Sequence, residues 1–374
     1  MKIDHLLLQN FRNYPECAIQ FQPGLNILVG RNAQGKTNLL ESIHFLSTGK
    51  SHRTNNQLDL IRWDNTGFFL RADITKGGVA MSVEFRLQRD RQRELRINGL
   101  PERRMSSLLG VINCVLFAPE DLQLLKGPPA LRRRFLDMEL SQISSTYLYS
   151  LQQYNRVLNQ KNRLLKTCLQ GRGDRTGVDV WNQQLVRFGA KVMQMRANAL
   201  ELLGKYARIN LFELTGHGEE LSLIYRPAGK TNHSLPKQEE AIRDLFWDML
   251  RKEQADELAR GQSLVGPHRD DFSCLINNID VRSFGSQGQQ RTCVLALKLA
   301  EIEFMHKMSG HYPILLLDDV LSELDEQRRS ALLQLVDRGI QTLMTGTEAA
   351  LFAGLADKSA LIAEISNGHV RIVV

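Results

Sequence analysis

The stretch Gly24-Leu-Asn-Ile-Leu-Val-Gly30-Arg-Asn-Ala-Gln-Gly35-Lys36-Thr37 decides the fold of this 374-residue chain. Its apolar first half ends on glycine and predicts a buried strand over residues 24–30. Its second half fits the spacing GxxxxGK(S/T) at every required position. Apolar residues at gaps of three and four, from Leu39 to Leu46, predict a helix that begins near Lys36. A strand, a glycine-rich loop and a helix in this order predict a phosphate-binding loop in an α/β fold.

This loop predicts a nucleoside triphosphate as ligand. Glycines allow backbone N–H groups to converge on phosphate oxygens, and the helix N-terminus adds the positive end of its dipole. We expect Lys36 to reach the β- and γ-phosphates as a catalytic residue, and the Thr37 hydroxyl to ligate Mg²⁺. The expected cofactors are therefore ATP and Mg²⁺. The residues expected to bind ATP through this loop are Gly30, Arg31, Asn32, Ala33, Gln34, Gly35, Lys36 and Thr37.

Two further runs are expected to complete the nucleotide site. Ile314-Leu-Leu-Leu-Asp318-Asp319 is a strand-length apolar run that ends in two carboxylates, which is how phosphate-loop proteins hold Mg²⁺. We expect Asp318 to ligate the metal, and Asp319 to be the catalytic residue that orients or deprotonates the attacking water. The run Ser286-Gln287-Gly288-Gln289 opens the preceding predicted helix. It is either a second anion cradle or only a capped helix start.

The pattern of the sequence changes twice along the chain. Strand-like patterning dominates the N-terminal part, and helical spacing of apolar residues follows Gly127-Pro128-Pro129. The α/β pattern returns after Gly261. We therefore predict one α/β domain split by a mostly helical insertion. Its first lobe covers residues 1–126, the helical arm covers 127–260 and the second lobe covers 261–374.

Composition and cysteine spacing exclude several classes of protein. The residues are 43% hydrophobic and 24% charged, as in ordinary globular proteins. Met1–Arg12 has no apolar core for a secretory signal, and no apolar run approaches the roughly 18 residues of a membrane helix. We therefore expect a cytoplasmic location and no membrane partner. The five cysteines contain no CxxC pair, so neither a disulfide frame nor a zinc site is predicted.

The net charge of +7 permits binding to a polyanion, and the basic residues are clustered. Each cluster is either a solvated face or a surface that contacts DNA phosphates. Neither a helix-turn-helix nor an aromatic stacking motif is evident, so any DNA recognition is expected to be independent of sequence. The candidates are Arg86, Arg89, Arg91, Arg93, Arg96, Arg103, Arg104, Arg156, Lys161, Arg163 and Lys166.

The order of the motifs resembles that of the ABC ATPase heads. Phosphate loop, serine–glycine signature, acidic strand and the loop Ser322–Asp325 follow one another as in that class. The resemblance implies an ABC-type head that dimerises on ATP. Ser286 and Gly288 would then contact the γ-phosphate held by the other subunit, and Asp325 would lie at the dimer seam. Thr345-Gly346-Thr347 stands where the class usually has its switch histidine.

Some positions depart from the class or have two interpretations. Gln287 replaces the first glycine of the signature, and Asp319 replaces the usual catalytic glutamate. Because aspartate is one methylene shorter, we expect only weak ATP hydrolysis, suited to a switch. By similarity to related heads, Arg12 either touches phosphate or is a surface arginine. Glu120 or Asp121 stands at the place of a glutamine lid, or these are loop acids that cap the next helix.

Several runs narrow the resemblance to one family. They are Leu8–Tyr14, Phe117–Leu122, Lys126–Pro129, Arg132–Asp137, Leu264–Asp271 and Gly285–Arg291. Together they resemble the RecF family of recombination-repair ATPases over essentially the whole chain. About 250 residues lie between phosphate loop and signature in this chain, whereas transporter heads have far fewer there. SMC-type ATPases insert much longer coiled coils.

We expect His268–Asp271 to form an Arg–Asp pairing network and not a metal cluster.

The resemblance to RecF implies a place in DNA repair. It implies binding to double-stranded and gapped DNA at single-strand/double-strand junctions, by an ATP-dependent homodimer without sequence specificity. RecR and RecO would be partners in helping RecA replace single-strand-binding protein at stalled replication forks and in inducing the SOS response. Two rivals remain. A transporter-type energising subunit would need a membrane partner, and a DNA-end-processing nuclease would need a further acidic metal cluster.

Overall fold

The structure is a computed structural model and describes residues 1–90, 92–174, 176–216, 218–228, 235–323, 325–347 and 360–373. The chain divides into two compact units. Unit 1 consists of Met1–Asp121 and Glu301–Val374, and unit 2 consists of Leu122–Ala300. The predicted assignment of residues 1–126 and 261–374 to two lobes of one head, with 127–260 as an arm, stays a prediction.

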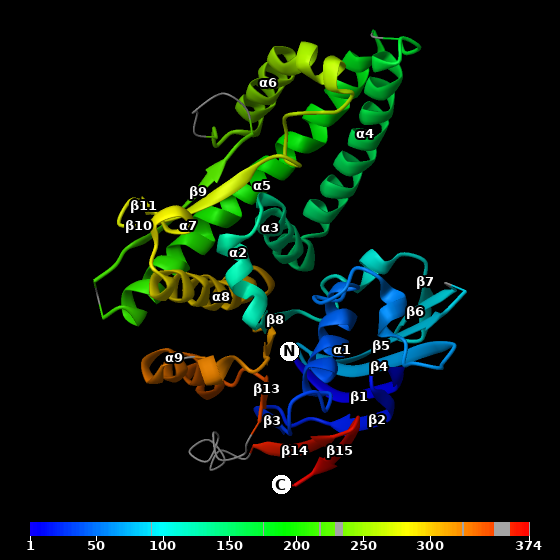
Figure 1. The fold of residues 1–374 in the computed structure, drawn as a ribbon, viewed down its shortest axis with the longest axis vertical. Coiled ribbons are helices and arrows are strands. Elements are labelled where there is room, and N and C mark those ends of the chain that lie inside the picture. The colour runs from blue at the N-terminus through cyan, green and yellow to red at the C-terminus, as the bar shows by residue number, and fades with distance from the viewer. Residues whose placement is uncertain are drawn as a thin grey trace. The chain divides into compact units, whose positions relative to one another are not determined.

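Unit 1 contains an antiparallel sheet with the strand order β2-β1-β4-β5-β6-β7. Its strands are β1 (Lys2–Phe11), β2 (Tyr14–Gln20), β4 (Gly67–Lys76), β5 (Val79–Gln88), β6 (Arg93–Ile97) and β7 (Leu100–Glu102). Buried residues alternate with partly exposed ones along β4, as expected for a sheet with one face on the core. The sheet is coloured blue to cyan in Figure 1.

A second sheet of unit 1 has the order β15-β14-β3-β13-β12-β8 and is parallel except at the β14–β15 pair. Its strands are β3 (Leu25–Val29), β8 (Cys114–Phe117), β12 (Ile314–Leu317), β13 (Thr342–Gly346), β14 (Leu361–Ser366) and β15 (His369–Ile372). Every residue of β3, β8 and β12 is buried, as in parallel strands covered on both faces. Because β3 and β12 both pair in parallel with β13, the loops that follow them leave the same edge of the sheet.

Helix α1 (Lys36–Thr48) follows β3 and packs into the core of unit 1. Leu39, Leu40, Ile43 and Leu46 on this helix are fully buried, and they share one hydrophobic cluster with residues of both sheets. The predicted helix is thereby confirmed. The remaining helical segments of this part of the chain are η1 (Gln57–Leu60), η2 (Met105–Leu108), η3 (Pro119–Leu122), η4 (Val320–Glu323) and α9 (Glu326–Asp337).

Unit 2 is mostly helical. Its helices are α2 (Gln123–Lys126), α3 (Pro129–Ile143), α4 (Ser145–Leu169), α5 (Gly177–Leu214), α6 (Glu239–Arg260), α7 (Val281–Phe284) and the first half of α8 (Gln287–Ser309). Helices α4, α5 and α6 lie side by side (Figure 1) and bury Tyr154, Met193 and Phe246 in a common core. A small antiparallel sheet of β9 (Leu221–Arg226), β10 (Asp271–Ile276) and β11 (Ile279–Asp280) completes the unit.

One basic residue of the arm, predicted to lie either on a solvated face or against DNA phosphates, is inside unit 2, so both interpretations are wrong for it. The Lys161 side chain is fully buried, and its Nζ lies 2.6 Å from Oε2 of Glu257 and donates to Oγ of Ser263 at 3.2 Å. Lys161 shares the face of α4 that carries Leu158 and Leu165, since these residues are three and four positions away. The other arm candidates, Arg156, Arg163 and Lys166, are exposed.

Candidate nucleotide-binding site

The loop between β3 and α1 needs glycine at both ends. Gly35 has a φ of 120°, and a Cβ atom there would lie 2.7 Å from the side chain of Asn13. A Cβ atom on Gly30 would lie 2.3 Å from the carbonyl oxygen of Ile365. Any other residue at these two places would collide with its neighbours, so the motif spacing reflects a closely packed loop. Ala33 within the loop also has a positive φ of 65°.

Neighbouring turns hold the loop in place. The Asn13 side chain donates to the carbonyl of Gln34 at 2.8 Å, and the buried Tyr14 hydroxyl donates to the carbonyl of Gly35 at 2.9 Å. From the β14–β15 turn, the backbone N–H of Asn367 donates to Oε1 of Gln34 at 2.7 Å. The loop is therefore preorganised by segments that lie far away in the sequence.

Lys36 begins α1 and is 3% exposed. Its Nζ donates to the carbonyl of Gly30 at 2.7 Å and to that of Arg31 at 3.2 Å. The ammonium group therefore lies inside the arch of the loop, beside the N-terminus of α1. Free backbone N–H groups and the helix dipole favour an anion at that end. The position suits the predicted contact of Lys36 with phosphate.

The acidic strand meets the phosphate loop at Thr37. The Thr37 hydroxyl donates to Oδ1 of Asp318 at 2.9 Å, and the Thr345 hydroxyl donates to the same oxygen at 3.0 Å. Thr345 Oγ1 in turn accepts a 2.8 Å hydrogen bond from the backbone N–H of Asp319. Asp319 has a φ of 51°, which is strained for a residue with a side chain. The three residues Thr37, Asp318 and Thr345 thus form one polar cluster at the edge of the parallel sheet.

The electrostatics of this cluster fit a divalent cation. Burial raises the pKa of Asp318 above its ordinary value, although hydrogen bonds from Thr37 and Thr345 oppose this. The carboxylates of Asp319 and Glu120 push the pKa of Asp318 further in the same direction. A carboxylate that is costly to ionise among other acids is one that a bound Mg²⁺ would stabilise. Carboxylate and hydroxyl oxygens are also the ligands that Mg²⁺ prefers.

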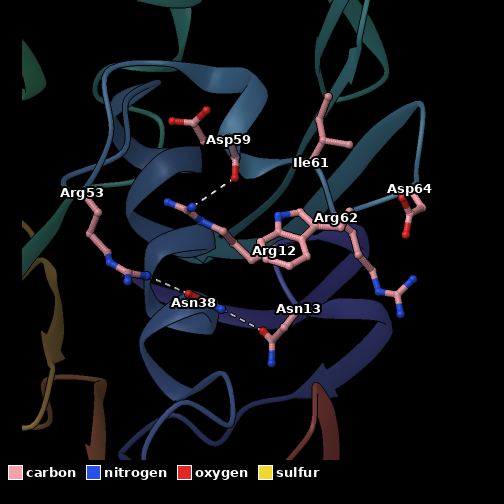
Figure 2. A pocket seen from close by; sticks show the side chains of 9 residues that line it. Arg12, Asn13, Asn38, Arg53, Asp59, Ile61, Arg62 and Asp64 are labelled. Atoms are coloured by element: carbon pink, nitrogen blue, oxygen red, sulfur yellow. Dashed lines mark hydrogen bonds between the residues drawn. The ribbon is translucent and has the colours of Figure 1, made fainter.

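An open cavity of about 620 Å³ lies next to this loop. Asn38, which directly follows Thr37, and Asn13, which is hydrogen-bonded to Gln34, form part of the wall of the cavity. Arg12, Arg53 and Arg62 also line it (Figure 2). The Trp63 side chain also lines the cavity and is 87% exposed. The wall also carries the acids Asp59 and Asp64, so three guanidinium groups face two carboxylates. An aromatic ring and an excess of cations suit a planar, anionic ligand.

Arg12 forms an ion pair with the buried Glu41. Neither of the two interpretations of Arg12, a phosphate contact or a surface arginine, predicts this pair. Nε of Arg12 and one terminal nitrogen donate to both carboxylate oxygens of Glu41 at 2.8 and 2.7 Å. Its other terminal nitrogen donates to the carbonyl of Asp59 at 3.0 Å. Arg12 also lines the cavity, so a contact with a nucleotide stays a prediction.

The signature segment of unit 2 forms a reciprocal cap on helix α8. The Gln289 backbone N–H donates to Oγ of Ser286 at 3.2 Å, and the Ser286 N–H donates to Oε1 of Gln289 at 2.9 Å. This capping box marks a stable helix start; it is compatible with both interpretations of the segment, so the anion cradle stays a prediction. Ser286, Gln287 and Gly288 are exposed, which leaves the predicted contact with a partner's phosphate as a prediction.

The neighbouring loop acids have different surroundings. Oδ2 of Asp121 accepts a 2.9 Å hydrogen bond from the backbone N–H of Ala118, so Asp121 stabilises its own loop. Glu120 is exposed and acts electrostatically on Asp318. In the loop Ser322–Asp325, residue 324 and the side chains of residues 322 and 323 lie outside the described residues. Asp325 caps α9 by accepting from the N–H of Arg328, and its place at a dimer seam stays a prediction.

The Arg–Asp pairing predicted for His268–Asp271 is confirmed at Asp271, while the Asp270 carboxylate is held by a tyrosine. Nε and a terminal nitrogen of Arg132 donate to the two carboxylate oxygens of Asp271 at 2.7 and 2.8 Å. Arg133 donates to the carbonyl of Asp270 at 2.7 Å, and the Asp270 carboxylate accepts from the Tyr225 hydroxyl. Among the described residues, no group of three or more His, Cys, Asp and Glu side chains is placed to hold a metal ion. No helix in the described part of the chain is both long and apolar enough to span a bilayer.

Three contributors to this site are not predicted by the sequence. The motif order marks Thr345 only as a switch position, although it joins Asp318 and Asp319 by hydrogen bonds. Asn13, on the β1–β2 turn, belongs to no motif that would indicate its support of the loop. Glu41 resembles a solvent-facing acid because it lies inside a helix. Its spacing of four residues from Thr37 on the same helix is its one link to the site in the sequence.

Comparison with known proteins agrees with this geometry. The sequence model of the family described as RecF/RecN/SMC N terminal domain matches residues 2–368. A Bacillus cereus (strain B4264) protein called DNA replication and repair protein RecF is 42% identical over 372 residues, 99% of this chain and 98% of the relative. A solved structure of the recombination mediator protein RecF-ATP in the RecFOR pathway has a TM-score of 0.91 at 32% identity and covers 100% of this chain and 97% of its own.

The Smc head domain of Pyrococcus furiosus is similar in fold alone. Its TM-score is 0.55 at 15% identity, over 99% of this chain and 95% of the other. The predicted fold class, an ABC-type ATPase head with an additional helical part, is thereby confirmed. With a family match over nearly its whole length and close relatives that carry one name, this chain belongs to the RecF family.

Proposed function

We propose that this chain is an ATP-dependent switch that binds DNA in recombinational repair and replication-fork maintenance. The observation that carries the proposal is the meeting of Thr37 with Asp318 beside Lys36, at the N-terminus of α1. This is the combination of phosphate cradle and metal-binding acid that phosphate-loop ATPases use. Membership of the RecF family supports it, because a RecF relative of this fold is described with ATP.

Each residue of the cluster has a role in this proposal. The backbone of residues 30–37 and the Lys36 ammonium bind the β- and γ-phosphates. Thr37 and Asp318 would hold Mg²⁺, which would supply positive charge to neutralise the phosphates. Asp319 orients the attacking water and is, with Lys36, a catalytic residue. The cavity beside Arg12 and Trp63 takes the nucleoside end of ATP.

ATP closes two copies of the chain into a homodimer in this proposal. The exposed Ser286 and Gly288 at the start of α8 supply a hydroxyl, backbone N–H groups and a helix dipole to the γ-phosphate held by the second copy. The capping hydrogen bond between Ser286 and Gln289 would present this hydroxyl in a fixed orientation.

The closed dimer binds DNA through its phosphate backbone, at gaps and single-strand/double-strand junctions. Exposed basic residues on α4 and near β5 and β6 support this, because they suit contacts that position a protein without reading bases. In the pathway implied by family membership, it works with RecR and RecO to help RecA replace single-strand-binding protein and to support the SOS response. Slow hydrolysis opens the dimer and releases the DNA.

Light scattering coupled to size-exclusion chromatography tests the switch. The expected mass is that of a dimer with ATP–Mg²⁺ and of a monomer with ADP or without nucleotide. Ser286→Arg is expected to stay monomeric under all three conditions. The matched control is Ser283→Arg, an exposed serine three residues earlier, which is expected to dimerise normally. The proposal would be contradicted if the measured mass of the unmutated protein did not change with ATP–Mg²⁺, or if Ser286→Arg formed a dimer.

A further inference from the structure

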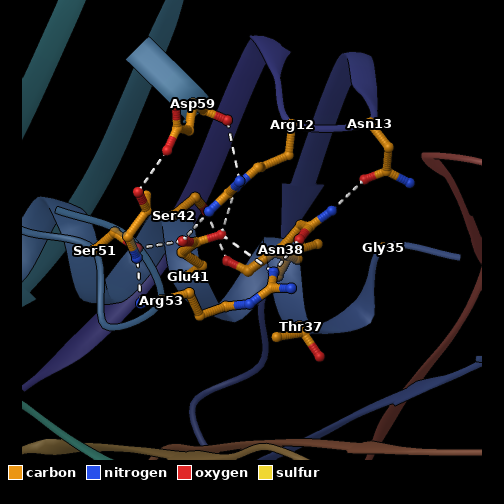
Figure 3. Close-up of polar contacts among 12 residues, drawn as sticks. Arg12, Asn13, Gly35, Thr37, Asn38, Glu41, Ser42, Ser51, Arg53 and Asp59 are labelled. Carbon is orange, nitrogen blue, oxygen red and sulfur yellow. Dashed lines mark hydrogen bonds and ion pairs between the residues drawn. The ribbon is translucent and has the colours of Figure 1, made fainter. Parts of the chain in front are cut away.

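Glu41 is a charged residue in the middle of α1 with no exposed surface. Burying a carboxylate is costly unless it is paired and hydrogen-bonded. Glu41 achieves this with the bidentate contact from Arg12, a hydrogen bond from the Ser51 hydroxyl, and an ion pair with Arg53 at 3.6 Å (Figure 3). Removing one partner of such a cluster leaves the other charges without compensation.

Three separate segments meet at this carboxylate. Arg12 lies at the turn between β1 and β2 and has a positive φ of 54°. Ser51 and Arg53 belong to the segment after α1, and the Asp59 carbonyl completes the coordination of Arg12. The fork of the Arg12 guanidinium is therefore fixed by three hydrogen bonds, and its orientation is set largely by Glu41.

A chain of hydrogen bonds leads from Arg53 to the phosphate loop. Arg53 donates to Oδ1 of Asn38 at 2.8 Å, and Asn38 donates to Oδ1 of Asn13 at 2.8 Å. Asn13 then donates to the carbonyl of Gln34 within the loop. Arg12, Asn13, Asn38 and Arg53 all line the cavity next to this loop (Figure 2). The ion-pair cluster and the candidate ligand cavity therefore share one wall.

Electrostatics keep Glu41 charged. Burial alone would raise the pKa of Glu41, but the hydrogen bonds from Arg12 and Ser51 outweigh it, so the pKa lies below its ordinary value. The carboxylate is therefore ionised at neutral pH and holds both guanidinium groups on one side. The Arg53 side chain is still 42% exposed, so part of it can meet a ligand.

We propose that Glu41 is a positioning residue, which fixes the guanidinium groups of Arg12 and Arg53 on the wall of the cavity so that both meet the nucleotide together. This inference rests on the proposed function, since it takes the ligand of the cavity to be ATP. Glu41 touches no ligand itself and acts through the two arginines.

The test measures binding of a fluorescent ATP analogue with Mg²⁺, in competition with ATP, together with the melting temperature. Glu41→Gln is expected to weaken the affinity for ATP about tenfold, because both guanidinium groups lose a charged acceptor. Asp271→Asn is the matched control, since it breaks an Arg–carboxylate pair of the same geometry in unit 2. It is expected to leave the affinity for ATP within about twofold of the wild-type value.

A double-mutant cycle separates positioning from a purely structural role. Arg12→Met alone is expected to weaken ATP binding, and the double variant is expected to lose less affinity than the sum of the losses of Arg12→Met and Glu41→Gln. Two fully additive effects on affinity would overturn the proposal. So would an unchanged affinity of Glu41→Gln with only its melting temperature lowered.

Two further outcomes are decisive. Where Glu41→Gln does not fold, Ser51→Ala removes a single hydrogen bond to Glu41 and is expected to weaken binding about threefold; an unchanged affinity there overturns the inference. If the unmutated protein does not bind ATP, the proposed function itself is overturned. Measuring the unmutated protein alone therefore distinguishes this failure from failure of the inference about Glu41.

Discussion

The Thr37 hydroxyl donates a 2.9 Å hydrogen bond to the Asp318 carboxylate, although 281 residues separate the two in the chain. The contact exists because β3 and β12 run in the same direction on either side of β13. The phosphate loop follows β3 and the acids follow β12, so both arrive at one edge of the sheet. A ligand bound at this edge would therefore couple two distant segments of unit 1.

Asp318→Asn is predicted to stabilise the protein and to abolish Mg²⁺-dependent ATP binding. Burial raises the folded-state pKa of Asp318 above its ordinary value, so this group favours folding only at lower pH. That contribution is lost as the pH rises through the folded pKa, and the ionised carboxylate destabilises the fold at pH 7. The melting temperature is therefore expected to rise at pH 7. A lowered melting temperature with normal ATP binding in calorimetry would refute the assigned role.

Steady-state ATP hydrolysis is predicted to be slow. Asp319 is one methylene shorter than the glutamate usual in ABC heads, so it would hold the attacking water less closely. We expect a turnover below about one per second in a coupled phosphate-release assay. Asp319→Asn is expected to lose this activity and keep ATP binding. A turnover of several per second would contradict the account of a switch.

Lys161→Ala is predicted to destabilise unit 2 strongly, by about 3–5 kcal/mol, since it leaves the carboxylate of Glu257 buried without its partner. The double change Lys161→Met with Glu257→Leu is expected to recover most of this loss. The exposed Arg163 on the same helix is the matched control, and Arg163→Ala is expected to change stability by less than about 0.5 kcal/mol. Urea unfolding curves measure all three variants, and equal effects of the two single changes would contradict the buried ion pair.

His268 is predicted to make the protein acid-sensitive. Burial, with the nearby positive charges of Arg269 and Lys161, lowers the pKa of His268 from 6.5 to about 4. Since the folded state keeps this imidazole neutral, its contribution is complete above pH 6.5 and is lost as the pH falls towards 4. The loss amounts to at most about 3 kcal/mol. His268→Gln should therefore lose less stability than the wild type between pH 7.5 and pH 5 in denaturant titrations, and equal losses would count against it.

The phosphate loop could be predicted from the sequence because its chemistry is local. The glycines, Lys36 and Thr37 lie within eight consecutive residues, and the flanking strand and helix have clear periodicities. The acids after β12 could be predicted for the same reason. The order of strands in the sheet could not, and it is this order that brings Thr345 to Asp318. A threonine at the end of a strand carries no sign of its partner.

Burial of charged residues within helices is harder to predict from the sequence than the phosphate loop. Glu41 and Lys161 both look like solvated surface residues in the sequence, yet both are fully buried. Their partners Arg12 and Glu257 lie 29 residues before and 96 residues after them, respectively. Helical spacing can indicate which face a residue shares, as it does for Lys161. Which of two charged residues finds a buried partner depends on tertiary packing, and no periodicity encodes that.

The measurement that tests the central claim most directly is the fluorescence anisotropy of a labelled gapped duplex titrated with protein, with and without ATP–Mg²⁺, at two salt concentrations. The account predicts binding only with ATP, weakened by salt as phosphate contacts require, and lost in both Lys36→Met and Ser286→Arg. Binding that is absent, or that is indifferent to ATP and to these two variants, would contradict the claim that ATP switches this protein onto DNA.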